Sequence, residues 1–173
     1  SRRVAGAVAT SMQNGRFPLV LGGDHSLSIG SVRGAAKYKK IGVIWLDAHG
    51  DVNTHLTTPS GNIHGMSLAA LCGLGDPRLT ALYDEPVPVI DPGKVAIIGA
   101  RDLDLGEKDN LRSAGALVLS MEQVDRIGMV AALEQCIEQV SRDVDGIYLS
   151  MDLDALDPRF APVVGTPVPG GLT

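Results

Sequence analysis

Short, continuously apolar runs alternate along the chain with segments whose apolar residues have helical spacing. A run without polar positions is typical of a strand that is buried on both faces of a parallel sheet. Such runs predict strands over residues 18–23, 41–47, 94–100, 116–120 and 146–154. Helical spacing predicts helices over residues 26–39, 104–114 and 121–143, with Ser26 and Ser120 as N-caps. Because strands alternate with helices, we expect an α/β fold with a parallel sheet and helices on both faces.

Two segments show neither pattern. Residues 49–65 are rich in polar residues and glycine, and long connections without regular structure usually serve a function. Residues 75–93 contain four prolines together with Gly93, and we expect them to form either a rim loop or an oligomer contact.

The composition is that of one packed domain of ordinary size, covering residues 1–173. Apolar residues make up 45% and charged residues 20%, which excludes a disordered chain or a disulfide-stapled miniprotein. The net charge is −5 and there is no basic tract, so we expect neither a nucleic-acid partner nor an anionic membrane partner. No apolar run approaches the roughly 20 residues that span a bilayer, and the N-terminus has no signal-peptide pattern. We therefore predict a soluble, cytoplasmic protein.

Three conspicuous side chains are expected to fill the core. Cys72 and Cys136 lie in apolar, helix-like stretches and form no C-x-x-C pair, so neither a disulfide framework nor a zinc ribbon is indicated. Trp45 lies inside the predicted strand 41–47.

Acidic and histidine side chains gather where the predicted strands end. Strand 18–23 is followed by His25, strand 41–47 by Asp47-x-His49-x-Asp51, and strand 146–154 carries Asp152-x-Asp154. A period of two places alternate side chains on one side of an extended segment. Since ligands of open parallel sheets collect at the carboxyl ends of strands, we expect these six side chains to meet at one rim. A single Asp-x-His would be read as a solvated turn.

Four carboxylates and two imidazoles in one crevice repel one another and are costly to desolvate without a cation. The set offers oxygen and nitrogen but no thiolate, which suits an ion such as Mn²⁺ better than structural zinc. Six ligands suit two ions that share carboxylates, and two such ions lower the pKa of a bridging water. This favours metal-assisted hydrolysis by a bridging hydroxide over a structural metal site.

Four segments resemble, in order and spacing, the signature motifs of the ureohydrolases, the family of arginases and agmatinases. They are LGGDHSLSIGS, WLDAHGDVNT, SGNIHGM and SMDLDALDP. The resemblance covers essentially all 173 residues and is strongest to bacterial-type arginases. It implies an α/β/α three-layer sandwich, two Mn²⁺ per chain, and hydrolysis of the guanidinium group of L-arginine to L-ornithine and urea.

The resemblance also implies a ligand set for each ion. One Mn²⁺ would be held by His25, Asp47, Asp51 and Asp152, and the other by Asp47, His49, Asp152 and Asp154. Asp47 and Asp152 would then bridge the two ions. Asp51 is also expected to act in catalysis, and His64 matches the proton-shuttle histidine of the family, for which an ordinary imidazole pKa is suitable.

Residues of the long loop match the positions that select an α-amino acid. Asn53, Ser60 and Asn62 match contacts to the α-carboxylate, and Asp104 matches the residue that takes the α-ammonium group. Without the resemblance, Asn and Ser in such a loop would be read as turn formers. Thr166 is expected to position the cluster or the substrate, and His55 is expected to be exposed and without a role.

Several residues and readings stay open at this point. Glu107 is either a first-turn helix acid that the dipole favours or a pocket residue, and Asp24 is expected to orient its neighbours. The family pattern precedes Ser1 and continues past Thr173 to a glutamate that grips the guanidinium group. We therefore expect a central fragment, truncated at both ends, with apolar surface exposed.

Two other functions compete with an arginase. One is an agmatinase or a related amidinohydrolase, and the other is a catalytically silent metal-binding domain. For the full-length enzyme the resemblance implies a homo-oligomer, a trimer or a hexamer.

Overall fold

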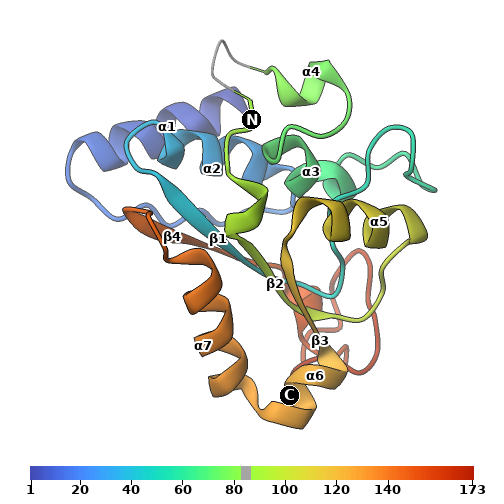
Figure 1. The fold of residues 1–173 in the computed structure, drawn as a ribbon. Coiled ribbons are helices and arrows are strands. Elements are labelled where there is room, and N and C mark those ends of the chain that lie inside the picture. Colours follow the sequence, from blue (N-terminus) through green and yellow to red (C-terminus); the bar gives the residue numbers. More distant parts are fainter. Residues whose placement is uncertain (83–86) are drawn as a thin grey trace.

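A four-stranded parallel sheet forms the middle of the molecule in the computed structural model, which describes residues 1–82 and 87–173 (Figure 1). Its strands are β1 (Ile41–Leu46), β2 (Val95–Ala100), β3 (Leu117–Ser120) and β4 (Gly146–Met151), in the order β3-β2-β1-β4. All three pairings are parallel. In the register, Leu46 at the end of β1 lies beside Ile98 and Met151. The chain therefore leaves β1 and β4 at the same edge of the sheet.

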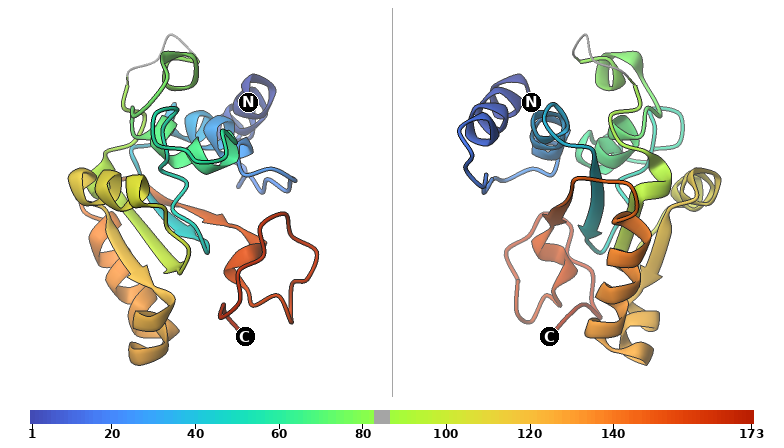
Figure 2. Two further views of the ribbon diagram at one scale, coloured as in Figure 1. Left: turned by 90° about the vertical axis from the view of Figure 1, so that its right-hand side faces the viewer. Right: turned by 60° about the vertical axis from the view of Figure 1, so that its left-hand side comes forward.

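Helices cover both faces of the sheet, as the sequence predicts. They are α1 (Arg2–Gln13), α2 (Leu27–Ala36), α3 (Ser67–Leu71), α4 (Pro77–Thr80), α5 (Leu105–Ala114), α6 (Met121–Ile127) and α7 (Met129–Val140), with 3₁₀ turns at His64–Met66, Pro92–Lys94 and Leu153–Ala155. Helices α1, α2, α3 and α5 lie on one side of the sheet, and α6 and α7 lie on the other (Figure 2). Buried side chains of the two groups join separate hydrophobic clusters with the strands. The expected α/β/α three-layer sandwich is confirmed.

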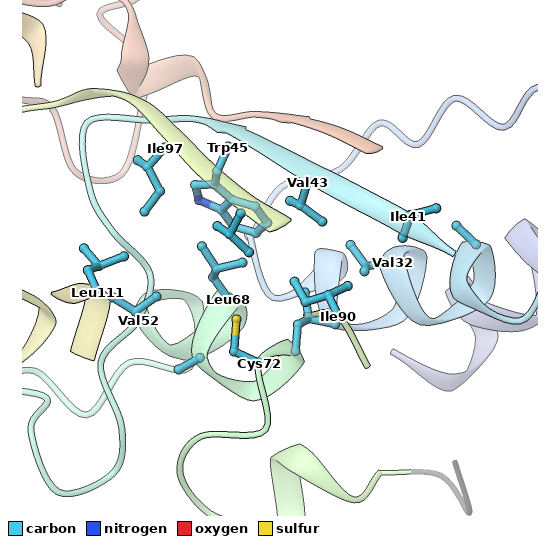
Figure 3. Close-up of a cluster of buried hydrophobic side chains, with 14 of the residues drawn as sticks. Val32, Ile41, Val43, Trp45, Val52, Leu68, Cys72, Ile90, Ile97 and Leu111 are labelled. Atoms are coloured by element: carbon cyan, nitrogen blue, oxygen red, sulfur yellow. The ribbon is translucent and has the colours of Figure 1, made fainter. Parts of the chain in front are cut away.

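The two hydrophobic cores follow the alternation of side chains along β1. Val43 and Trp45 point into the core beneath α2 and α3, where Leu68 and Cys72 meet them (Figure 3). Ile44 points to the opposite face and packs with Cys136 of α7. Cys72 and Cys136 are buried free thiols, so the prediction that both cysteines and Trp45 fill the core is confirmed.

The predicted strand over residues 18–23 is wrong. These residues lack strand structure, and Leu19 and Leu21 are 76% and 85% exposed. An apolar run becomes a strand only when a neighbouring strand supplies hydrogen bonds, and none of the four described strands pairs with this segment. The segment still delivers His25 to the carboxyl edge of the sheet, as described below.

The predicted helix over residues 121–143 is divided by Gly128, whose φ of 83° lies outside the helical region. Ser120 caps the first half, because its hydroxyl accepts a hydrogen bond from the backbone N–H of Gln123. Ser26 begins α2 without such a bond. Helix α1 was not predicted, although its buried Ala5, Val8 and Ala9 have helical spacing.

One face of the edge strand β4 is uncovered. Ile147, Leu149 and Met151 lie on the same side of the sheet as Ile44, and all three are substantially exposed. The expectation of exposed apolar surface is confirmed. Among the described residues, no helix is long and apolar enough to cross a membrane.

The contact between α1 and α2 generates a stability prediction. A Cβ added at Gly34 would lie 2.6 Å from the carbonyl oxygen of Ala5, so Gly34→Ala forces the two helices apart. We expect a loss of about 1–3 kcal/mol in the free energy of unfolding, measured by urea denaturation. Gly6→Ala is the matched control, because Gly6 lies in α1 with nothing within 4 Å of its added Cβ. That control should gain up to about 1 kcal/mol from helix propensity. Equal changes in the two variants would contradict the packing argument.

Candidate active site

The six predicted ligand residues meet at the carboxyl edge of the sheet. Asp47 follows β1, Asp152 follows β4, and both chain segments continue directly into further acidic residues. Asp154 is held in place by backbone contacts, because its Oδ1 accepts a hydrogen bond from the N–H of Ala48 at 3.2 Å. This hydrogen bond joins the chain after β1 to the chain after β4 without the help of a ligand.

His25 lies at the centre of three carboxylates. Its Nδ1 is 3.1 Å from Oδ2 of Asp47, 3.0 Å from Oδ2 of Asp51 and 3.1 Å from Oδ2 of Asp152. Neighbouring ligands at about 2.1 Å from one octahedral ion are separated by about 3.0 Å, the product of 2.1 and √2. The separations therefore match those of a ligand shell.

A second group lies beside the first and shares Asp47 with it. Nδ1 of His49 is 3.1 Å from Oδ2 of Asp154 and 3.4 Å from Oδ1 of Asp47. Two compact ligand groups result among the described residues, one of His25, Asp47 and Asp51, and one of Asp47, His49 and Asp154. Asp47 thus lies where a bridging carboxylate is expected. Asp152 approaches His25 but belongs to neither compact group, so its bridging role stays a prediction.

Two observations indicate that the residues present fit a cation. Nδ1 of His25 and Oδ2 of Asp51 are buried and close together, yet neither makes a hydrogen bond of good geometry. Unsatisfied buried polar atoms are rare in proteins and need a physical reason. A metal ion between them would satisfy both atoms, and all six donors are nitrogen or oxygen.

The pKa values of the cluster show the same need for positive charge. Burial lowers the pKa of His25, but the surrounding carboxylates, Asp152 first, outweigh it and raise the pKa to about 12. Hydrogen bonds to Asp154 and Asp47 raise the pKa of His49 to about 10. Burial raises the pKa of Asp51 to about 7. Protons on the imidazoles thus balance the carboxylates, and metal binding would displace those protons.

The backbone at Asp51 is held in an unusual conformation. Its φ is 53°, a value that residues other than glycine rarely adopt. The carbonyl oxygen of Asp51 accepts hydrogen bonds from the N–H groups of Leu68 and Ala69, at the start of α3. These bonds compensate the strain and direct the carboxylate toward His25.

Ser150 and Trp45 contact His25 and Asp47 and hold their side chains in place. The hydroxyl of Ser150 lies 2.8 Å from Nε2 of His25, which leaves Nδ1 free to face the carboxylates. Trp45 stacks on the His25 ring with a centroid distance of 4.1 Å, and its Nε1 donates to Oδ2 of Asp47. Such supporting contacts fix the ring orientation of a metal-binding histidine.

The cluster lies in a cleft of about 920 Å³, which also brings the predicted substrate residues together. Its lining includes Asn53, Ser60, Asn62, His64, Asp104 and Thr166. Within this set, Nδ2 of Asn53 donates to Oδ2 of Asp104 at 2.8 Å, and Oδ1 of Asn53 accepts from the Thr57 hydroxyl. Asn53 is therefore fixed on both sides, whereas Ser60 and Asn62 are exposed at the tip of the loop.

His64 belongs to neither compact ligand group. Its Nδ1 lies 3.2 Å from Oδ2 of Asp24, and 37% of its side chain is exposed. The expectation that Asp24 orients a neighbour is confirmed. His55 is exposed, as predicted.

Thr166 and Arg101 position Asp154. The Thr166 hydroxyl donates to Oδ2 of Asp154 at 3.0 Å. The Arg101 guanidinium donates to the carbonyl oxygens of Asp154 and Val168. It therefore connects the chain at Asp154 to the C-terminal segment that contains Thr166 and Val168. Sequence reasoning missed Arg101 and Ser150, because their contacts join segments that are distant along the chain. For Glu107 both readings are confirmed, since this residue lies in the first turn of α5, where its side chain accepts a hydrogen bond from the backbone N–H of Asp104, and it also lines the cleft.

The fold and the site define a class, namely three-layer parallel α/β proteins with a candidate binuclear metal centre at the carboxyl ends of adjacent strands. Residues 1–173 match the Arginase family, and the chain belongs to this family.

Individual relatives agree with this assignment. The arginase of Bacillus caldovelox is 54% identical over 174 residues, which cover 100% of this chain and 58% of that protein. The crystal structure of arginase from Bacillus cereus is 55% identical, with a TM-score of 0.95, and the match covers 99% of this chain and 59% of that chain. Proclavaminate amidino hydrolase from Streptomyces clavuligerus is 27% identical, with a TM-score of 0.76, over 98% of this chain and 52% of that chain. The chain thus spans about 58% of the length of the curated relative.

The contact between Ser150 and His25 generates a prediction. Ser150→Ala removes the group that fixes Nε2, so we expect metal affinity to fall about 10–100-fold. Isothermal titration of the metal-free protein with Mn²⁺ measures this change. Ser141→Ala, at an exposed position after α7, is the matched control and should bind like the wild type. Unchanged affinity in Ser150→Ala would show that His25 needs no support from Ser150.

Proposed function

We propose that the protein hydrolyses the guanidinium group of L-arginine to L-ornithine and urea, using two Mn²⁺ held by the cluster. The observation that carries this proposal is the pair of ligand groups that share buried Asp47, in a cleft that also holds the Asn53–Asp104 pair. Membership of the Arginase family supports the metal dependence.

The proposed ligand sets combine the sequence motifs with the observed groups. His25, Asp47, Asp51 and Asp152 would hold one ion, and Asp47, His49, Asp152 and Asp154 the other. When bound, such ions lower the pKa of a coordinated water toward neutrality, which supplies a nucleophile. Asp51 would act in catalysis through its place in this ligand set.

The substrate end of the cleft would bind the α-amino-acid part of L-arginine. The Asp104 carboxylate would accept hydrogen bonds from the α-ammonium group, a charge-assisted interaction. Asn53, Ser60 and Asn62 would donate to the α-carboxylate directly or through water. Thr166, which already contacts Asp154, would position the reacting end.

His64 would carry protons between bulk water and the leaving amine. Its partly exposed ring lies outside both ligand groups and contacts Asp24. Proton transfer by a positioned side chain contributes about 10²–10⁴ in rate. Added imidazole should therefore partly restore turnover in a His64→Ala variant.

An agmatinase-like activity and a catalytically silent metal-binding domain stay the alternatives. The single domain over residues 1–173, the cytoplasmic location and the homo-oligomer, a trimer or hexamer, also stay predictions.

Metal counting tests the shared ligand. After reconstitution with Mn²⁺, elemental analysis should find two ions per wild-type chain, none in Asp47→Ala and one in His49→Ala. Asp47→Ala affects both sites because this carboxylate belongs to both groups. His64→Ala is the control and should retain two ions, with turnover reduced. Two ions in Asp47→Ala would refute the bridging assignment, and loss of an ion in His64→Ala would make His64 a ligand.

Substrate comparison tests the proposed reaction. Because polar groups left without partners reject an analogue that lacks them, kcat/KM for L-arginine should exceed that for agmatine by at least about a hundredfold. Urea release by a Mn²⁺-loaded enzyme that spans the full length of its relatives measures both values. Comparable values would favour the agmatinase alternative. Metal binding by that enzyme without urea from either substrate would favour the silent domain.

A further inference from the structure

Two side chains of α5 form hydrogen bonds with the backbone N–H and carbonyl groups of Val52, an arrangement that we call the Val52 clasp. The Val52 N–H donates to Oε1 of Glu107 at 3.1 Å, and the Val52 carbonyl oxygen accepts from Nδ2 of Asn110 at 2.7 Å. Glu107 and Asn110 are three residues apart and therefore lie on one face of the helix. Val52 lies between Asp51 and Asn53, so the clasp acts at the junction of the metal cluster and the substrate end.

Glu107 also holds Asp104, the residue to which the Asn53 side chain donates. Its second oxygen, Oε2, accepts a hydrogen bond from the N–H of Asp104 at 3.1 Å. Nδ2 of Asn53 then donates to Oδ2 of Asp104. These contacts form a closed ring, in which one carboxylate sets the spacing between the Val52 segment and the start of α5.

Glu107 is buried, so its carboxylate depends on the hydrogen bonds of this ring instead of on solvent. The residue is only 3% exposed, and burial raises the pKa of its carboxyl. In the described part of the chain, no Lys, Arg or His side chain forms an ion pair with it. A Cβ at Gly50 would lie 3.0 Å from its Oε1, so the chain opposite the carboxylate has no room for a side chain. A buried carboxylate without a cation is costly and must be held by its hydrogen bonds.

We propose that Glu107 and Asn110 are positioning residues that set the preference for an α-amino-acid substrate. They act through others, because they hold Asn53 and Asp104 at hydrogen-bond distance and so prearrange the groups that meet the α-carboxylate and α-ammonium. This inference rests on the proposed function and identifies the residues that determine its specificity. Agmatine keeps the ammonium group but lacks the α-carboxylate, so it can use only part of this prearrangement.

The experiment compares Asn110→Ala and Glu107→Gln with the wild type on L-arginine and agmatine. Asn110→Ala loses the hydrogen bond to the carbonyl oxygen of Val52. Glu107→Gln loses at least one hydrogen bond of the ring, since a Gln amide offers one oxygen to the two backbone N–H groups. We expect KM for L-arginine to rise about tenfold with kcat nearly unchanged, while kcat/KM for agmatine, which engages only the ammonium side of the pair, falls by a smaller factor. The ratio of the kcat/KM value for L-arginine to that for agmatine should therefore fall. Ser113→Ala, exposed on the same helix, is the matched control.

A second measurement does not depend on activity. In the metal-free, substrate-free protein, amide hydrogen exchange at Val52 should be faster in Glu107→Gln than in the wild type, because the acceptor of that N–H is weakened. Exchange at Ile97 in β2 should stay unchanged, which excludes global destabilisation.

The outcomes separate this inference from the proposed function. A wild type without preference for L-arginine would refute the proposed function, whatever the variants do. A wild type that prefers L-arginine, together with variants that keep this preference in full, would overturn only the proposed positioning role of Glu107 and Asn110. Equal losses on both substrates, or faster exchange throughout the sheet, would show a merely structural role and would also overturn it.

Discussion

The rest of the site depends on one buried carboxylate. Asp47 is 1% exposed at the end of the central strand β1, and its two oxygens face the two imidazoles of the cluster. Trp45 donates to one of these oxygens from the core, and the backbone N–H of His49 donates to the other. A charge in this position is tolerated because donors face both of its oxygens, although Asp51 repels it. Positive charge must therefore be supplied where the two ligand groups meet.

The topology of the sheet brings these groups together without long-range adjustment. β1 and β4 are parallel neighbours, so their carboxyl ends open at one edge and place Asp47 and Asp152 side by side. Bringing Asp51 to the same place requires a strained backbone, because this residue adopts a positive φ. The N–H groups of Leu68 and Ala69 at the start of α3 stabilise this conformation by donating to its carbonyl oxygen. The ends of the strands thus fix the candidate metal ligands, whereas the long loop and α5 fix the Asn53–Asp104 pair of the proposed substrate site. The Val52 clasp is the point where the two parts connect.

The sequence was sufficient for the parts of this arrangement that have a local pattern. The motif after β1 identified Asp47, His49 and Asp51 as neighbours, but the chain bends there and Asp51 has a positive φ, so their proximity does not arise from the extended period-two geometry that the sequence predicts. Apolar runs identified the four described strands. The run over residues 18–23 misled because apolar composition reports burial potential, whereas a strand needs a partner, which this segment does not have among the described residues. Ser150 and Arg101 had no local signal, since a serine inside a strand or an arginine after one acquires its role only when distant segments meet. The motif resemblance predicts that Asp104 contacts the substrate, which stays a prediction, and the structure shows that Asn53 and Glu107 hold this residue.

The charge of the cleft bears on which substrates it admits. Several carboxylates line it besides the ligands, and among them the side chain of Asp102 is 68% exposed, 3.9 Å from Nε2 of His49. Arg101, a cation beside the cluster, directs its donors to backbone carbonyl oxygens and forms no ion pair with Asp102, Asp104 or Asp24 among the described residues. Two divalent ions would offset the ligand charge but not that of Asp102, Asp104 and Asp24 at the rim. Because a cleft lined by one sign of charge concentrates ligands of the opposite sign, a guanidinium or ammonium compound is favoured over an anionic one. Under the proposed function, charge would restrict the class of substrate, and the Asn53–Asp104 pair would discriminate within that class.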